Sequence, residues 1–177
     1  LHANFGGPGT AGAFAAHNSN IIEPGTFPTA KVVGGTDFAG NAYTGQNIPI
    51  PDPDPLDCNG HGSHVAGTAT GFGVNADGTT FPGPWDGSVP FSSFSIGPGV
   101  APRAQLYALK VFGCAGSTGL TTQAINWAVD PYGDGEPSDH VDVNNMSLGS
   151  NFGTSTDASA AASTNASLAG VIVVTSA

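Results

Sequence analysis

The stretch Asp57–Thr68 reads DCNGHGSHVAGT, and the interpretation of the whole chain depends on it. It predicts a helix, because small and apolar residues follow two side chains, Asp57 and Asn59, that can cap a helix N-terminus. His61 would lie at the N-terminus of this helix, where the helix dipole disfavours a positive charge. His64 follows one turn later beside small residues, so we expect it to be packed inside the molecule.

Three roles are open for these histidines on residue type alone. A helical histidine is often just a structural residue. His61 and His64 could instead bind a metal together, although zinc needs three or four ligands and the HExxH pattern of zinc proteases is absent from this sequence. The third role is a general base, for which His61 is suited because Gly60 and Gly62 leave room for a nucleophile and a substrate.

The segments around this helix alternate between strand and helix patterns. Strands are predicted over Lys31–Val33 (ended by Gly34 and Gly35), Ala104–Phe112, Val141–Leu148 and Val171–Thr175 (fully buried), and helices over Ala11–Ala16, Thr121–Val129 and Ser155–Ala169. Such alternation is typical of parallel βαβ units, so the fold class is α/β. Residues 44–57 are proline-rich and irregular, and residues 71–101 are too long for an ordinary connection, which indicates a functional loop or an insertion.

The charge balance restricts the partners of the chain. Three basic residues stand against 13 acidic ones in 177 residues, for a net charge of −10, which disfavours nucleic acids and anionic membranes. No apolar run in the sequence is long enough to span a membrane. The two cysteines, Cys58 and Cys114, are consistent with two buried thiols or with one disulfide.

Four ordered motifs resemble those of the subtilase family, the subtilisin-like serine proteases of peptidase family S8. NGHGSHVAGT is similar to the family's histidine motif, and it is followed by APRAQLYALKVFGCAGST at Ala101–Thr118, DVNNMSLGS at Asp142–Ser150 and AGVIVVTSA at Ala169–Ala177. The resemblance runs from about Lys31 to Ala177. It implies part of a three-layer α/β fold built on a parallel sheet, and the activity of a serine endopeptidase.

The resemblance also implies roles for particular residues. His61 would be the base of an Asp-His-Ser triad and His64 a structural residue. An extended polypeptide substrate would pair by main-chain hydrogen bonds with two walls of a cleft. One wall would consist of Gly116, Ser117 and Thr118, and the other of Ser147, Leu148 and Gly149.

Two members of the triad have no counterpart in the chain. Asp37 stands in the context GGTDF, which is similar to a strand after the catalytic aspartate, and no serine stands in the family's GTSMAxP context. We therefore expect residues 1–177 to be part of one catalytic domain, truncated at both ends, with an insertion at about 71–101, and inactive alone.

Further expectations follow from the same family. The insertion and FSIGPGVAP at Phe94–Pro102 resemble larger secreted bacterial subtilases, which implies a secreted, extracellular protein with a propeptide and a protease-associated domain. The family fold would bring Cys58 and Cys114 together beside the cleft as a disulfide. No cofactor is required, but calcium remains open as a ligand of the hard oxygens of Asp52, Asp54 and Asp57.

Two alternative functions remain. The first is a catalytically inactive subtilase-like domain that serves for binding or as a scaffold. A family resemblance supports a shared fold more firmly than a shared activity. The second is a metal-dependent hydrolase that uses His61 and His64.

Overall fold

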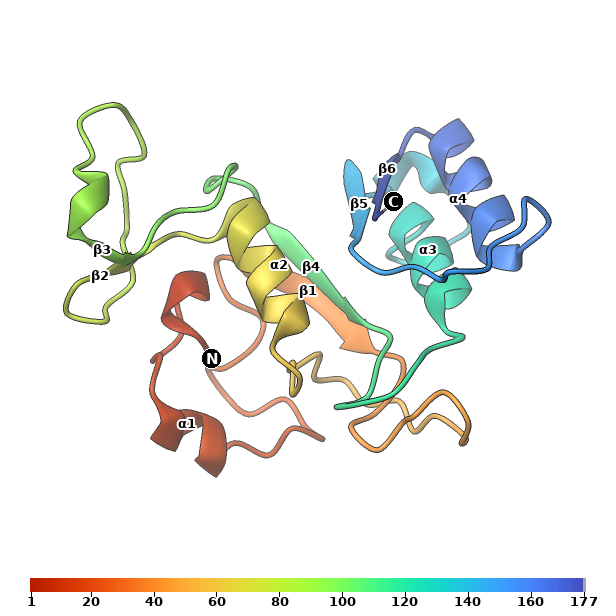
Figure 1. The fold of residues 1–177 in the computed structure, drawn as a ribbon, viewed down its shortest axis with the longest axis horizontal. Coiled ribbons are helices and arrows are strands. Elements are labelled where there is room, and N and C mark those ends of the chain that lie inside the picture. The colour runs from red at the N-terminus through yellow and green to blue at the C-terminus, as the bar shows by residue number, and fades with distance from the viewer. Residues whose placement is uncertain (177) are drawn as a thin grey trace. The chain divides into compact units, whose positions relative to one another are not determined.

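A computed structural model describes residues 1–176, which form two compact units, one ending at Gly116 and one beginning at Ser117 (Figure 1). The first unit contains η1 (Ala3–Phe5), α1 (Ala11–Ala16), β1 (Val32–Asp37), α2 (His61–Thr70), β2 (Val74–Asn75), η2 (Phe91–Ser93), β3 (Phe94–Ile96) and β4 (Leu106–Lys110). The second contains α3 (Thr121–Val129), η3 (Pro137–Asp139), β5 (Val143–Met146), α4 (Ala158–Ala169) and β6 (Ile172–Thr175). Within residues 1–176, no helix is long and apolar enough to cross a membrane.

The first unit is built on the parallel pair of β1 and β4, which lie side by side in Figure 1. The predicted end of β1 at Gly34 and Gly35 was wrong, because the strand continues to Asp37. Gly35 has a φ of +128°, and a Cβ atom on it would lie 2.0 Å from the carbonyl oxygen of Ala108 in β4. Glycine therefore continues this strand, since only a residue without a side chain allows the two backbones to approach so closely.

Residues 71–101, the predicted insertion, contain a small sheet within the first unit. Strands β2 and β3 pair in antiparallel orientation within it. Its aromatic rings pack on one another, with Phe72 and Trp85 stacked at 5.7 Å and Phe81 and Phe94 edge to face at 4.9 Å between centroids. The indole N–H of Trp85 also donates to the Phe72 carbonyl at 2.8 Å. The segment is thus a small sheet closed by aromatic contacts.

The second unit packs α3 and α4 on one face of the parallel pair of β5 and β6. Its core consists of apolar residues from α3, β5 and α4 and of the residue just before β6: Ile125, Met146, Ala162, Ala166 and Val171. The prediction that residues 171–175 are fully buried was wrong, because Ile172 and Val174 are exposed. In a strand, side chains alternate between faces, and the described helices cover only one face of this pair.

The remaining elements follow the sequence pattern closely. Helices α1 and α3 have the predicted bounds, while α4 begins later, where the Asp157 carboxylate accepts the backbone N–H of Ser159 at 2.9 Å. It ends at Gly170, whose φ is +111°. Parallel strand pairs combined with helices confirm the predicted α/β class.

Candidate active site

The N-terminus of α2 is held by the carboxylate of Asp57. Its Oδ1 accepts the backbone N–H groups of Asn59 at 2.8 Å and Gly60 at 2.9 Å, and its Oδ2 accepts the N–H and the hydroxyl of Ser63, both at 2.8 Å. Gly60, with a φ of +97°, occupies the cap position in place of the predicted Asp57 or Asn59. Asp57 nevertheless pairs with a donor of the first turn, so it sets the direction in which His61 enters the helix.

These contacts give Asp57 a distinct dependence on pH. Burial opposes its negative charge, but hydrogen bonds from Gly60, Ser63 and Asn59 outweigh burial and lower its pKa below the ordinary 3.8. A carboxyl group whose pKa is lowered by folding contributes stability above the pKa of the unfolded chain. It loses that contribution as the pH falls through the pKa of the folded state.

We expect Asp57→Ala to lower the free energy of unfolding by about 1–2 kcal/mol at neutral pH, as for other lost helix caps. In strong acid the wild-type carboxylate is protonated, so the difference between the two proteins should shrink. Urea unfolding at neutral and acidic pH measures both values, and Asp57→Asn is a matched control that keeps one acceptor without the charge. A loss of stability that is equal at both pH values would contradict this role.

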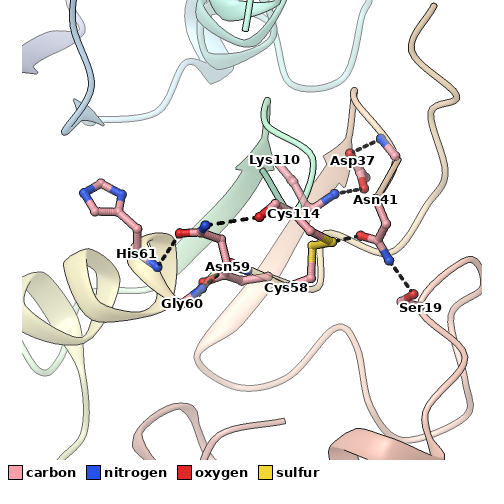
Figure 2. Close-up of a disulfide and its surroundings, with 11 residues drawn as sticks. Ser19, Asp37, Asn41, Cys58, Asn59, Gly60, His61, Lys110 and Cys114 are labelled. Atoms are coloured by element: carbon pink, nitrogen blue, oxygen red, sulfur yellow. Dashed lines mark hydrogen bonds and ion pairs between the residues drawn. A yellow bond between two sulfur atoms is a disulfide. The ribbon is translucent and has the colours of Figure 1, made fainter. Parts of the chain in front are cut away.

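The two histidines of α2 are both exposed. The backbone N–H of His61 donates to Asn59 Oδ1 at 3.4 Å, and Figure 2 shows its ring projecting away from the neighbouring disulfide. The prediction that His64 is packed inside was wrong. The hydroxyl of Thr68 bonds to the His64 carbonyl at 3.0 Å, so this residue contributes its backbone to the helix while its side chain faces outward.

The structure contains the predicted disulfide between Cys58 and Cys114, with 5.1 Å between the Cα atoms (Figure 2). Around it, the side-chain amide of Asn59 donates to the Cys114 carbonyl at 3.2 Å, and the Cys114 N–H donates to the Asn41 carbonyl at 3.0 Å. The disulfide therefore fastens the turn just before His61 to the segment that follows β4.

Asp37 lies at the end of β1, but it is engaged in structural contacts. Its side chain is 1% exposed and forms an ion pair with Lys110 of β4. Its Oδ1 also accepts the N–H groups of Ala39 at 2.7 Å and Gly40 at 2.8 Å. A carboxylate that is buried and bonded in this way holds the loop after β1.

Of the two predicted cleft walls, Ser147–Gly149 lies in the second unit, whereas Gly116–Thr118 spans the boundary between the units. Gly116 closes the first unit with a φ of +95°, where a Cβ atom would lie 2.5 Å from the Thr44 carbonyl oxygen. Ser117 and Thr118 begin the second unit.

Ser147, Leu148 and Gly149 directly follow β5. The Leu148 carbonyl accepts the hydroxyl of Ser176 at 2.8 Å. The pairing of these two segments around one substrate stays a prediction.

The carboxylates that were candidates for calcium are not gathered into one site. Asp57 caps α2, as described above, and Asp54 hydrogen bonds to His17 at 2.5 Å. Asp52 forms a backbone bridge with Asp37. Each of these groups thus has a separate structural role.

A different acidic group meets the geometric requirement for a cation. Among the residues that the structure describes, Asp130, Asp134 and Asp139 are the three whose ligand atoms lie within 4.8 Å of one another. Oδ1 of Asp139 is buried and has no hydrogen-bonding partner in this part of the chain. Sequence reasoning missed this group, although DPYGDGEPSD at residues 130–139 combines closely spaced aspartates with turn-forming glycines. No described metal-binding group includes His61 or His64.

Parallel strand pairs combined with helices define an α/β protein. The family model of the subtilase family matches residues 32–177, and the chain belongs to this family, which confirms the resemblance seen in its motifs.

Several named relatives align with most of the chain. It is 37% identical to a subtilisin-like protease of Coccidioides posadasii. That alignment of 129 residues covers 72% of this chain and 25% of that protein. It is 31% identical over 154 residues to a thermostable alkaline protease of Halalkalibacterium halodurans, covering 80% and 32% of the two chains. It is also 31% identical over 150 residues to subtilisin Savinase of Lederbergia lenta, covering 77% and 42%. The chain thus spans between a quarter and two-fifths of the length of these relatives.

Proposed function

We propose that the protein to which this chain belongs is a secreted serine endopeptidase, and that His61 is the general base of its triad. One observation carries the proposal. Within the family's histidine motif, an exposed imidazole lies at the start of α2, and both the Asp57 carboxylate and the Cys58–Cys114 bond hold its turn. A base must reach the substrate and keep its orientation, and this arrangement serves both needs.

In the proposed reaction a serine attacks the carbonyl carbon of the scissile peptide bond while His61 takes the hydroxyl proton. The imidazolium then donates this proton to the leaving amine, and an aspartate on its other nitrogen keeps it oriented. The serine and the aspartate have no counterpart among the 177 residues, so they would be supplied from outside this segment. A propeptide and a protease-associated domain outside it belong to the same proposal.

The substrate would be an extended polypeptide. It would pair with Gly116–Thr118 on one side and Ser147–Gly149 on the other, through backbone groups that recognise any sequence. The chemistry needs no cofactor. A calcium ion would contribute to stability, and among the described residues Asp130, Asp134 and Asp139 offer it the best ligand set.

The proposal is tested on the protein together with its flanking segments. We expect it to hydrolyse an unstructured protein such as casein, to be labelled by a serine-directed fluorophosphonate, and to stay active after a chelator has removed transition metals. Loss of activity with the chelator but no labelling would favour the metal-dependent hydrolase. A folded protein with neither turnover nor labelling would favour the binding or scaffold domain.

Residues 1–177 expressed alone are expected to show no peptidase activity above background. In subtilisin itself, loss of the aspartate lowers turnover about 10⁴-fold and loss of the serine about 10⁶-fold, and this chain lacks both residues. The release of dye from a peptide substrate measures the outcome. Turnover by this chain that disappears on His61→Ala would refute the expectation.

A further inference from the structure

The side chain of His17 is buried between two carboxylates. Its Nδ1 lies 2.9 Å from Glu23 Oε2, and its Nε2 lies 2.5 Å from Asp54 Oδ2. The imidazole is 2% exposed, Asp54 is 6% exposed and Glu23 is 34% exposed. The proposed catalytic chemistry makes no use of this cluster, which joins residues that are 37 positions apart in the chain.

Between two ionised carboxylates, this geometry is satisfied when both ring nitrogens carry protons. A carboxylate oxygen at hydrogen-bonding distance from each nitrogen needs an N–H from each, and only the imidazolium has two. A neutral ring would turn a nitrogen lone pair toward one of the two carboxylates. It would also leave the negative charges of Glu23 and Asp54 without a positive charge between them. Burial opposes the charge on His17, but the hydrogen bonds and charges of Asp54 and Glu23 outweigh it and raise the pKa of the ring above its ordinary 6.5.

The cluster ties the N-terminal segment to the loop that precedes His61. His17 ends helix α1, and Glu23 is joined to the same turn because its Oε1 accepts the N–H of Asn18 at 3.0 Å. On the other side, the Asp54 N–H donates to Asp52 Oδ1 at 2.9 Å, three residues before the helix-capping Asp57. The His17 imidazolium is therefore the link between residues 11–26 and residues 52–57.

We propose that His17 is a pH-dependent latch, which in its imidazolium form holds residues 11–26 on residues 52–57 and on losing a proton releases residues 11–26 from the loop that leads to His61. The latch is a property of the first unit and does not depend on the proposed protease function. Because folding raises the pKa of His17, its stabilising contribution is complete below the ordinary pKa of 6.5. That contribution is lost as the pH rises through the pKa of the folded state.

Other ionisable groups face the cluster from the neighbouring elements. Asp52 interacts electrostatically with Asp54, and Asp52 in turn faces both Asp37 of β1 and Lys110 of β4. In residues 1–177 expressed alone, the amino group of Leu1 also interacts with Asp54, and burial lowers the pKa of that amine. Asp52 adds negative charge that favours the imidazolium, whereas the Leu1 amine opposes it. Neither of them has the two opposed donors with which His17 joins Glu23 to Asp54.

The latch is tested in this chain by hydrogen exchange of individual amides, corrected for the intrinsic effect of pH. The variant His17→Gln fills similar space without the charge. At about pH 6 we expect it to lower the protection of the Asn18 and Asp54 amides about tenfold relative to wild type, as for a lost charge-assisted hydrogen bond. Above the pH at which the wild-type ring loses its proton, located by an NMR titration of that ring, the two proteins should agree within about twofold. His2→Gln, in an exposed histidine of the same segment, should leave both values unchanged.

A protection difference that is the same at both pH values, or absent at both, would overturn the latch. If His17→Gln fails to fold, Glu23→Gln replaces it, because that carboxylate is partly exposed and its loss is milder. An NMR titration of the His17 ring then gives the answer. The latch requires its pKa to fall in Glu23→Gln, and an unchanged pKa would refute it.

Discussion

His61→Ala in the protein with its flanking segments is expected to lower kcat by about 10⁶-fold, the loss known for the corresponding residue type in subtilisin. The reason is proton transfer: without a base beside it, a serine hydroxyl is a poor nucleophile. In the described chain His61 is exposed at the start of α2, so its removal leaves no cavity. The KM for a peptide substrate should change little, because in the proposed mode of binding the substrate pairs with the backbone of the predicted cleft walls.

His64→Ala is the matched control for this prediction. His64 lies on the same helix, carries the same ring and is also exposed. We expect its loss to lower kcat less than about tenfold, since the proposed mechanism gives its exposed side chain no part in proton transfer. Thermal unfolding of both variants should remain close to wild type. If the two substitutions reduced kcat equally, or if both lowered binding of a metal, His61 would not be the base of a serine protease.

Replacing Cys58 and Cys114 together with serine is expected to lower the free energy of unfolding by about 4 kcal/mol. The bond closes a loop with a sequence separation of 56, and opening it restores the conformational freedom of that loop in the unfolded chain. The loop contains α2 and residues 71–101, so the loss of stability should extend across the first unit. Denaturant unfolding of the variant and of the oxidised wild type measures this difference.

The same substitution should also loosen the turn before His61. The Asn59 amide bonds to the Cys114 carbonyl next to the disulfide, so hydrogen exchange at residues 59–61 should rise in the variant. A single substitution, Cys114→Ser, separates loss of the bond from exposure of a thiol at Cys58. Two titratable thiols in the native protein, or unchanged stability after both cysteines are replaced, would show that the bond is not part of the folded state.

Local sequence patterns predicted the helices better than the strands. The bounds of α1 and α3 follow from a change in hydrophobic period and from capping or turn residues, which act within a few positions of one another. The end of β1 was misjudged because glycine usually interrupts a strand. Here the close approach of Ala108 in another strand makes glycine necessary, and that neighbour is more than 70 residues away.

The candidate site was predictable in part. The histidine motif singled out His61, and the order of four motifs indicated both the family and the pairing of the two cysteines. The outward position of His64 was not predictable, because it depends on which face of α2 the rest of the unit covers. The acidic group at residues 130–139 was overlooked, since the folding of one loop brings its three carboxylates together.

The sequence by itself determined the α/β class, the family and the residue best suited to act as a base. These three conclusions depend on the residue types and spacings within single segments and on the order of those segments along the chain. Only the tertiary structure decided that Asp37 is bonded to Lys110, that Asp57 holds the start of α2, and that His17 lies between two carboxylates. Each of these depends on burial and on partners brought close by folding, because the charge state of a side chain depends on what surrounds it in space.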